Sequence, residues 1–184
     1  MNNVRKMIKK HYTKFLGRPA YQYDVPLEGY GCMTVYECHN QPCDGAVTLA
    51  TVGMSDLCPS HTLQELIFCA YREFISTDLV KLLGVVVKEI VGSDGPVGRG
   101  EVLGPAGPLL DSTPMEALYI CPPTYYPKRF ARLRIDGSAI SIVWLIPIHR
   151  SEAVYIYEYG YDKFESQLEE LDPDLMDLRR PAIN

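Results

Sequence analysis

A glycine-rich stretch between Gly92 and Gly104 has the composition of a phosphate-binding loop, with the sequence GSDGPVGRGEVLG. Such loops use closely spaced glycines to bring several backbone N–H groups to one anion at the start of a helix. Gly98 and Gly100 fit the first two positions of a G-x-G-x-x-G motif, but Leu103 occupies the third. Further glycines and prolines follow in place of a helix, and no Lys-Ser or Lys-Thr pair completes a P-loop. The stretch therefore predicts tight turns at positive φ and no nucleotide site.

Four side chains of the types that ligate zinc occur at short spacings, Cys38 with Cys43 and Cys58 with His61. A C-x4-C and a C-x2-H pair could each supply two ligands from one turn to a tetrahedral ion. The intervening segment, Gly45–Gly53, has the β-branched composition of a core strand, and isolated cysteines often behave as small buried apolar residues. We therefore expect no metal and no other cofactor.

Candidates for nucleophilic or acid–base catalysis lack the required spacing. The segment from Gly53 to Leu57 reads GMSDL and so misses the second glycine of a G-x-S-x-G nucleophile elbow. The four histidines (11, 39, 61 and 149) lie in separate segments, and none has a carboxylate at a motif spacing. The acid pair Glu169-Glu170 points to two different faces of a helix. The sequence predicts a protein that is not an enzyme.

The length of 184 residues predicts one domain, residues 1–184, and a chain with 47% apolar and 22% charged residues is ordinary for a globular protein. No apolar segment precedes the fold as a secretion signal would, and Ile140–Ile148 is too short to span a membrane. We expect a cytoplasmic protein with reduced cysteines. The net charge of −5 predicts neither general nucleic-acid binding nor membrane binding.

Charge is divided unevenly between the two ends of the chain. The first 18 residues contain six Lys or Arg and no acid, whereas eight acids follow from Glu158 onward. The two ends could pair with each other, or each could serve a partner. For the basic end, a helix face exposed to solvent is a simpler interpretation than a face that contacts nucleic acid or an anionic membrane.

Hydrophobic periodicity and turn residues indicate mixed helices and strands without strict alternation, which predicts an α+β fold with a mixed, largely antiparallel sheet flanked by helices. The segment Val154–Tyr161 is ambiguous, because its alternate tyrosines fit a strand and its apolar residues before Gly160 fit a short helix. The predicted helices are Asn3–Leu16, Thr62–Ile75 (with a Thr62–Glu65 capping box), Ser76–Ile90 and a last helix capped by Asp162 and ending near Leu171; the predicted strands are Gly31–Cys38, Gly45–Gly53, Met115–Cys121 and Ala139–Ile148.

Three phrases occur together in the order known from one protein family: GRGEVLGPAGPL, then PPTYYP, then LIPIHRSEAVYIYEYGYDKF. Their combination resembles the suppressor of fused domain family, and the resemblance becomes loose before Asp44. It implies a helix for the ambiguous segment. The positions that carry it most specifically are Gly98, Gly100, Gly104, Pro105, Gly107, Pro108, Pro122, Pro123, Pro127, Pro147, Glu152, Gly160 and Phe164.

The resemblance implies a protein-binding function. The chain is similar to short bacterial members, many of which resemble immunity proteins that bind and block a cognate polymorphic toxin, including basic nucleases. The alternative is a regulatory scaffold that sequesters an endogenous protein, such as a transcription or signalling factor. Of the thirteen tyrosines, several cluster, as at 125–126 and at alternate positions from 155 to 161. Beside the acidic tail such a cluster would suit contact with a basic protein, although packing at the edge of the core explains it equally well. The predicted contact residues are Glu165, Glu169, Asp172, Asp174, Tyr159 and Tyr161.

Overall fold

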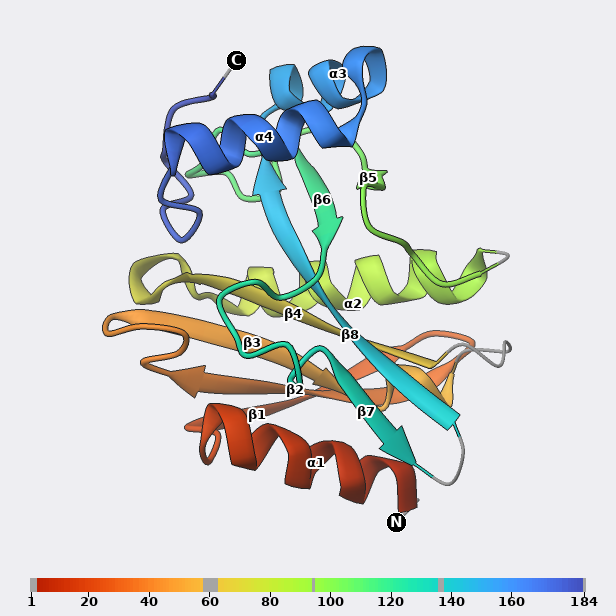
Figure 1. The fold of residues 1–184 in the computed structure, drawn as a ribbon. Helices are drawn as coiled ribbons and strands as arrows, with labels where there is room; N and C mark the ends of the chain where they lie inside the picture. Colours follow the sequence, from red (N-terminus) through yellow and green to blue (C-terminus); the bar gives the residue numbers. More distant parts are fainter. Residues whose placement is uncertain (1–2, 58–62, 94, 136–137, 184) are drawn as a thin grey trace.

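The computed structural model describes residues 3–57, 63–93, 95–135 and 138–183. Its four α-helices and eight strands form one α+β domain, as predicted (Figure 1). In chain order the elements are α1 (Asn3–Leu16), β1 (Tyr21–Leu27), β2 (Gly31–His39), β3 (Ala46–Val52), the short 3-10 turn η1 (Met54–Asp56), β4 (Leu63–Tyr71), η2 (Arg72–Phe74), α2 (Thr77–Gly92), β5 (Val102–Leu103), β6 (Ala117–Cys121), β7 (Arg132–Ile135), β8 (Ser138–Ile148), α3 (Arg150–Tyr159) and α4 (Tyr161–Leu171).

The strands form one sheet in the order β1-β2-β3-β4-β8-β6-β5, with β7 pairing on β8. Strands β1 to β4 form an antiparallel meander, and β5 to β8 pair antiparallel among themselves. The two groups meet where β4 and β8 run parallel, with Leu63 opposite Ile140 and Phe68 opposite Leu145. The described residues therefore form a mixed, mostly antiparallel sheet.

Helices cover both faces of the sheet and bury two cores (Figure 1). Helix α2 packs on one face through its buried stripe, including Leu79, Leu83 and Val87. On the other face, α1 contacts β3 and β7 at one end and α3 contacts β6 at the other. Burial of each large apolar side chain contributes about 1.5–3 kcal/mol, so both helical layers are held mainly by the hydrophobic effect.

Several predicted elements are confirmed. Helix α1 has the predicted bounds, and its buried residues Ile8, Tyr12 and Leu16 follow the helical period. The N-terminus of α2 is capped as expected, because the Leu79 backbone N–H donates to the Ser76 hydroxyl oxygen at 3.2 Å. The ambiguous segment is helical: α3 ends at Tyr159, directly before Gly160 at φ +86°.

Other elements correct the sequence predictions. Leu63–Tyr71, predicted as the body of a helix, is strand β4, while Thr62 of the proposed capping box lies outside the described residues. The N-cap of α4 is Gly160, and Asp162 lies within the first turn. Strands β1, β5 and β7 were not predicted.

Among the residues that the structure describes, no ion pair joins the basic end of the chain to the acidic end. Helix α1 and helix α4 lie at opposite ends of the domain (Figure 1), and the ion pair of α1 joins Arg5 to Asp56 of η1 at 2.6 Å. Each end therefore presents its own charge to solvent. None of the described helices is long and apolar enough to span a membrane.

Candidate protein-interaction surface

Helices α3 and α4 form a hairpin at the end of the longest strand, β8. Gly160 alone separates the two helices, and its φ of +86° suits glycine, which has no Cβ to clash with the backbone. At the other end of α3, the His149 backbone N–H donates to Glu152 Oε2 at 2.8 Å, which ties the first helical turn to the end of β8. The hairpin is thus fixed at both ends of α3.

The glycine-rich stretch packs against the start of α4. A Cβ on Gly100 would lie 2.3 Å from the ring of Tyr161, so only glycine leaves room for that ring. The guanidinium of Arg99 forms an ion pair with Glu165, and the Tyr119 hydroxyl donates to Glu165 Oε1 at 2.6 Å. These contacts dock α4 on the loop and on β6.

The electrostatics of this cluster favour an ionised Glu165. The hydrogen bond from Arg99 and the hydroxyl of Tyr119 lower the pKa of the Glu165 carboxyl. Burial, followed by the hydrogen bond to Glu165, raises the pKa of Tyr119, which therefore stays protonated and keeps donating. Beside it, the buried ring of Phe164 meets Tyr119 edge to face at 5.2 Å.

A buried ion pair holds the C-terminal segment against α3. Arg180 donates to Glu152 Oε1 at 2.6 Å and to Oε2 at 2.8 Å, and both side chains are almost completely buried. The Ile183 backbone N–H donates to the same carboxylate at 3.1 Å. The His149 ring contacts the Arg180 carbonyl oxygen at 2.8 Å, so this histidine at the end of β8 serves packing of the C-terminus.

Large apolar side chains are exposed along the hairpin. Tyr157 is 63% exposed, Leu171 55% and Tyr159 52%, and Val154 and Tyr161 are also exposed. Of the nine exposed large apolar residues in the described part of the chain, these five fall within the hairpin, and the other four lie singly elsewhere. Arg150, Ser151, Val154, Tyr155 and Glu158 line a shallow hollow on the outer side of α3. An exposed patch of this kind on rigid helices is typical of a protein-binding site.

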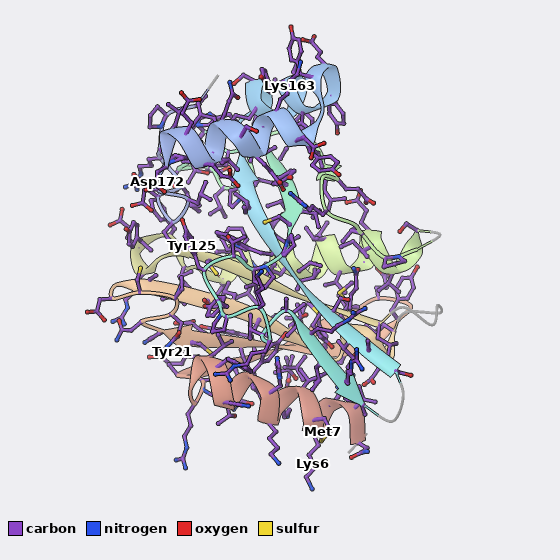
Figure 2. All side chains as sticks on the ribbon, in the orientation of Figure 1. Lys6, Met7, Tyr21, Tyr125, Lys163 and Asp172 are labelled. Atoms are coloured by element: carbon purple, nitrogen blue, oxygen red, sulfur yellow. The ribbon has the colours of Figure 1, made fainter. Side chains whose placement is uncertain are left out.

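The predicted contact residues fall into two groups. Glu169, Asp172, Tyr159 and Tyr161 are exposed on the hairpin, and Figure 2 shows Asp172 at the end of α4. Glu165 is bound to Arg99 and Tyr119 as described above. Asp174 accepts a hydrogen bond from the Tyr71 hydroxyl at 2.7 Å. Sequence reasoning missed Val154, Tyr157 and Leu171; the i, i+3 spacing of Val154 and Tyr157 within α3 could have indicated the first two.

The residues that carry the family resemblance have structural roles at this end of the domain. A Cβ on Gly104, which has φ +93°, would lie 3.1 Å from the Glu116 carbonyl oxygen, and the Glu101 backbone N–H donates to the Gly98 carbonyl oxygen at 3.2 Å. Pro147 lies within β8 and its carbonyl oxygen accepts from Arg180 at 3.4 Å. The glycines and prolines that also carry the resemblance lie in turns beside β5 and β6. Pro105, Gly107 and Pro108 follow β5, and Pro122, Pro123 and Pro127 follow β6.

The metal hypothesis is only partly covered by the described residues. Cys38 is buried in the core and Cys43 is exposed, while Cys58 and His61 lie outside the described part of the chain. Within that part, no three His, Cys, Asp or Glu side chains are grouped so that they could hold a metal ion.

One buried carboxyl, Glu65 of β4, stands apart from the hairpin. Its Oε1 accepts from the Gly53 N–H at 2.9 Å and the Ser55 hydroxyl at 2.8 Å, and its Oε2 accepts from the Thr51 hydroxyl at 2.6 Å. Burial raises the pKa of Glu65 to about 7, against these hydrogen bonds, which lower it. The side chain is fully enclosed, so it ties β3, η1 and β4 together and is closed to substrates.

Comparison with known proteins agrees with this architecture. Residues 29–181 match the family model for suppressor of fused protein. The chain belongs to the suppressor of fused family. The match starts in the turn before β2, earlier than Asp44, where the sequence resemblance became loose.

Solved structures share the fold at low sequence identity. A suppressor of fused homolog from Neisseria gonorrhoeae has a TM-score of 0.82 and 15% identity, covering 99% of this chain and 97% of that one. The Sufu–Fu complex has a TM-score of 0.69 and 11% identity, with 98% of this chain and 90% of that chain covered. Drosophila suppressor of fused has a TM-score of 0.69 and 12% identity, and this chain spans 50% of it. The search of curated proteins gave no significant match.

Proposed function

We propose that the domain is a non-enzymatic immunity protein that binds a cognate polymorphic toxin through the exposed face of the α3–α4 hairpin and blocks it. The observation that carries the proposal is the group of exposed tyrosines and aliphatic residues on two helices fixed by Gly160, Glu165 and the Glu152–Arg180 pair. Rigid aromatic side chains give large contact area at low entropic cost, and they are enriched at binding hot spots.

The charge of the hairpin indicates a basic partner. From Glu158 to Asp177 the chain has eight acids and one lysine, Lys163. Asp172 and Lys163 mark the two ends of α4 in Figure 2. Such a field accelerates encounter with a basic protein and complements a nucleic-acid-binding site, as in a nuclease toxin.

The family supports a binding function over catalysis. The Sufu–Fu complex shows a protein of similar fold bound to a protein partner. That complex also favours the second candidate function, a regulatory scaffold that sequesters an endogenous protein such as a transcription or signalling factor. Gene neighbourhood separates the two candidates: an adjacent gene for a large secreted toxin favours immunity, and an isolated gene favours the scaffold.

The direct test is affinity capture with the tagged domain from its own host, followed by mass spectrometry. Recovery of one stoichiometric partner with a toxin-like C-terminal domain is the expected result. Recovery of a transcription or signalling factor would instead favour the scaffold. Inhibition of the toxin by the purified domain in a growth or nuclease assay then completes the test.

The contact surface is mapped with matched variants. Tyr157→Ala should weaken binding roughly 30-fold, the cost of losing a hot-spot residue of about 2 kcal/mol. Its control, Val85→Ala, removes an equally exposed apolar side chain from α2 and should leave binding unchanged.

The charge reversal Glu169→Lys/Asp172→Lys should reduce the association rate and its salt dependence. The control Glu28→Lys/Glu89→Lys makes the same change in net charge on the α2 side of the domain. Equal effects of the two pairs would place the contact surface elsewhere.

A further inference from the structure

The buried carboxyl of Glu65 lies on the sheet face that α1 covers. Side chains alternate between the two faces of a strand, and Ile67, two residues further along β4, packs in the same core as Ile8 and Tyr12 of α1. Burial, followed by the charge of Glu65, raises the pKa of the Tyr12 hydroxyl, so this residue of α1 is within electrostatic reach of the carboxyl. Figure 1 shows α1 running along this side of the sheet. The sheet and α1 therefore enclose Glu65 between them.

Glu65 has hydrogen-bond donors but no counter-ion in the described part of the chain. There, none of the Lys, Arg or His side chains has a nitrogen within 4.0 Å of its carboxyl oxygens. All of its donors described above are neutral groups, and a further one is the Ser55 backbone N–H at 3.2 Å. Because an enclosed acid without a counter-ion favours its neutral form, burial raises the pKa of Glu65 to about 7.

The elements around Glu65 supply no free positive charge. Their titratable side chains are Arg5 and Tyr12 of α1, Cys38 of β2, which interacts electrostatically with Tyr12, and Asp56 of η1. Strand β8 places the apolar Ile142 opposite Glu65. Arg5 is the only cation of this set, and it is already paired with Asp56 at 2.6 Å. An ionised Glu65 would thus remain largely uncompensated while the core stays closed.

The turn η1 connects Glu65 to α1. On its inner side, the backbone N–H of Gly53, the residue before η1, donates to Glu65 Oε1. On its outer side, Arg5 of α1 donates to the Asp56 carboxylate at 2.6 Å and to the Cys32 carbonyl oxygen at 2.9 Å. The Arg5 guanidinium lies directly over Gly53, where a Cβ would be only 2.6 Å from it. A displacement of η1 would therefore disturb the contacts of α1 as well.

Helix α1 also buries a polar group without a partner. The Tyr12 hydroxyl is enclosed and forms no hydrogen bond with any residue that the structure describes. A buried hydroxyl that lacks a partner has lost its bonds to water without replacement, which costs free energy. Opening α1 would return water to the Tyr12 hydroxyl and to the Glu65 carboxyl together. The two groups thus favour the same local opening.

We propose that Glu65, η1 and α1 form a proton-controlled latch, in which loss of the Glu65 proton releases η1 and α1 from the sheet while the α2 layer stays folded. Local opening is enough to bring water to the carboxylate, so it relieves the buried charge without unfolding the whole domain. The folded pKa of about 7 lies above the ordinary value of 4.5, so the closed latch is most stable at low pH and loses stability as the pH rises through this window. The latch requires no partner and does not depend on the proposed binding function.

The test is hydrogen–deuterium exchange read by mass spectrometry at several pH values, with protection corrected for the intrinsic exchange rate. Amides of α1 should be less protected than amides of α2 at every pH, because α1 opens locally. Their protection should fall about 40-fold between about pH 5 and about pH 7 and then level off. Equal protection of α1 and α2 would mean that only the whole domain opens, and it would overturn the proposal. So would protection of α1 that does not change with pH.

Three variants assign the effect to Glu65. Glu65→Gln removes the titrating group and should remove the pH dependence of α1 protection. The control Glu37→Gln changes another buried glutamate, which lies two residues from Val35 of the core under α2, and should retain that dependence. Ser55→Ala keeps Glu65 but removes a donor that lowers its pKa, so the protection of α1 should level off at a higher pH than in the wild type. A wild-type pH profile in Ser55→Ala, or in Glu65→Gln, would contradict the latch.

Discussion

Replacement of Arg180 by methionine tests how the C-terminal segment is held. The substitution keeps an unbranched side chain of similar length but removes the charge that faces Glu152. Among the described residues, the fully buried carboxylate of Glu152 would then keep only the backbone N–H donors of His149 and Ile183. Two charged hydrogen bonds of 2.6 and 2.8 Å would be lost.

The expected cost is large because a buried charge loses its counter-ion. Removing one partner of a buried ion pair typically costs about 3–5 kcal/mol, since the remaining charge is left uncompensated. Arg179, the neighbouring residue, provides the control: its ion pair with Glu73 has both side chains more than half exposed. Arg179→Met should therefore cost less than about 1 kcal/mol.

Urea unfolding followed by circular dichroism gives the free energies of unfolding. A double variant, Glu152→Met/Arg180→Met, replaces the pair by apolar side chains and should be more stable than Arg180→Met alone. The reasoning is refuted if Arg180→Met costs no more than Arg179→Met. It is equally refuted if the losses of unfolding free energy in Glu152→Met and Arg180→Met add up to the loss in the double variant, because the effects of removing two coupled buried charges are not additive.

Three further predictions concern the core and the glycine-rich stretch. Because burial raises the pKa of Glu65 to about 7, the folded state holds an extra proton between pH 4.5, the unfolded pKa, and about pH 7. The free energy of unfolding should therefore fall by up to about 3 kcal/mol as the pH rises through this window. Glu65→Gln should abolish that pH dependence in urea unfolding. Gly100→Ala should cost about 2–4 kcal/mol through positive φ and the clash with Tyr161, whereas Gly107→Ala, also at positive φ but with open space, should cost only the backbone strain of about 1–2 kcal/mol. Trp144, the single tryptophan, is buried, so its fluorescence should resist acrylamide quenching until the domain unfolds; strong quenching of the native protein would contradict its place in the core.

Much of the fold could be predicted from local patterns. The amphipathic period of α1, the Ser76 cap of α2 and the glycine after α3 each depend on residues close in sequence. Strand β4 could not be predicted, because it is buried on both faces beside β8, and its apolar run Leu66–Ala70 also suits a buried helix. The strand β7 has only four residues, which gives alternation little weight.

The candidate site was predictable in composition but not in detail. Acidic residues and tyrosines could be assigned to the C-terminal region from sequence. The contacts of Glu165 with Arg99 and Tyr119 could not be predicted, because these partners are far from Glu165 in the sequence and meet it only in the folded protein.

The parallel pairing of β4 with β8 has a consequence for the order in which the domain folds. The meander β1–β4 can form from local hairpins, but residues 63–68 must wait for residues 140–145 before the described sheet becomes continuous. Closing so long a loop is entropically costly and makes folding slow. During synthesis β4 therefore remains an unpaired apolar edge, exposed to aggregation, until most of the chain has been made. The α3–α4 hairpin follows β8 directly, so the proposed binding surface is assembled last and only on a completed sheet.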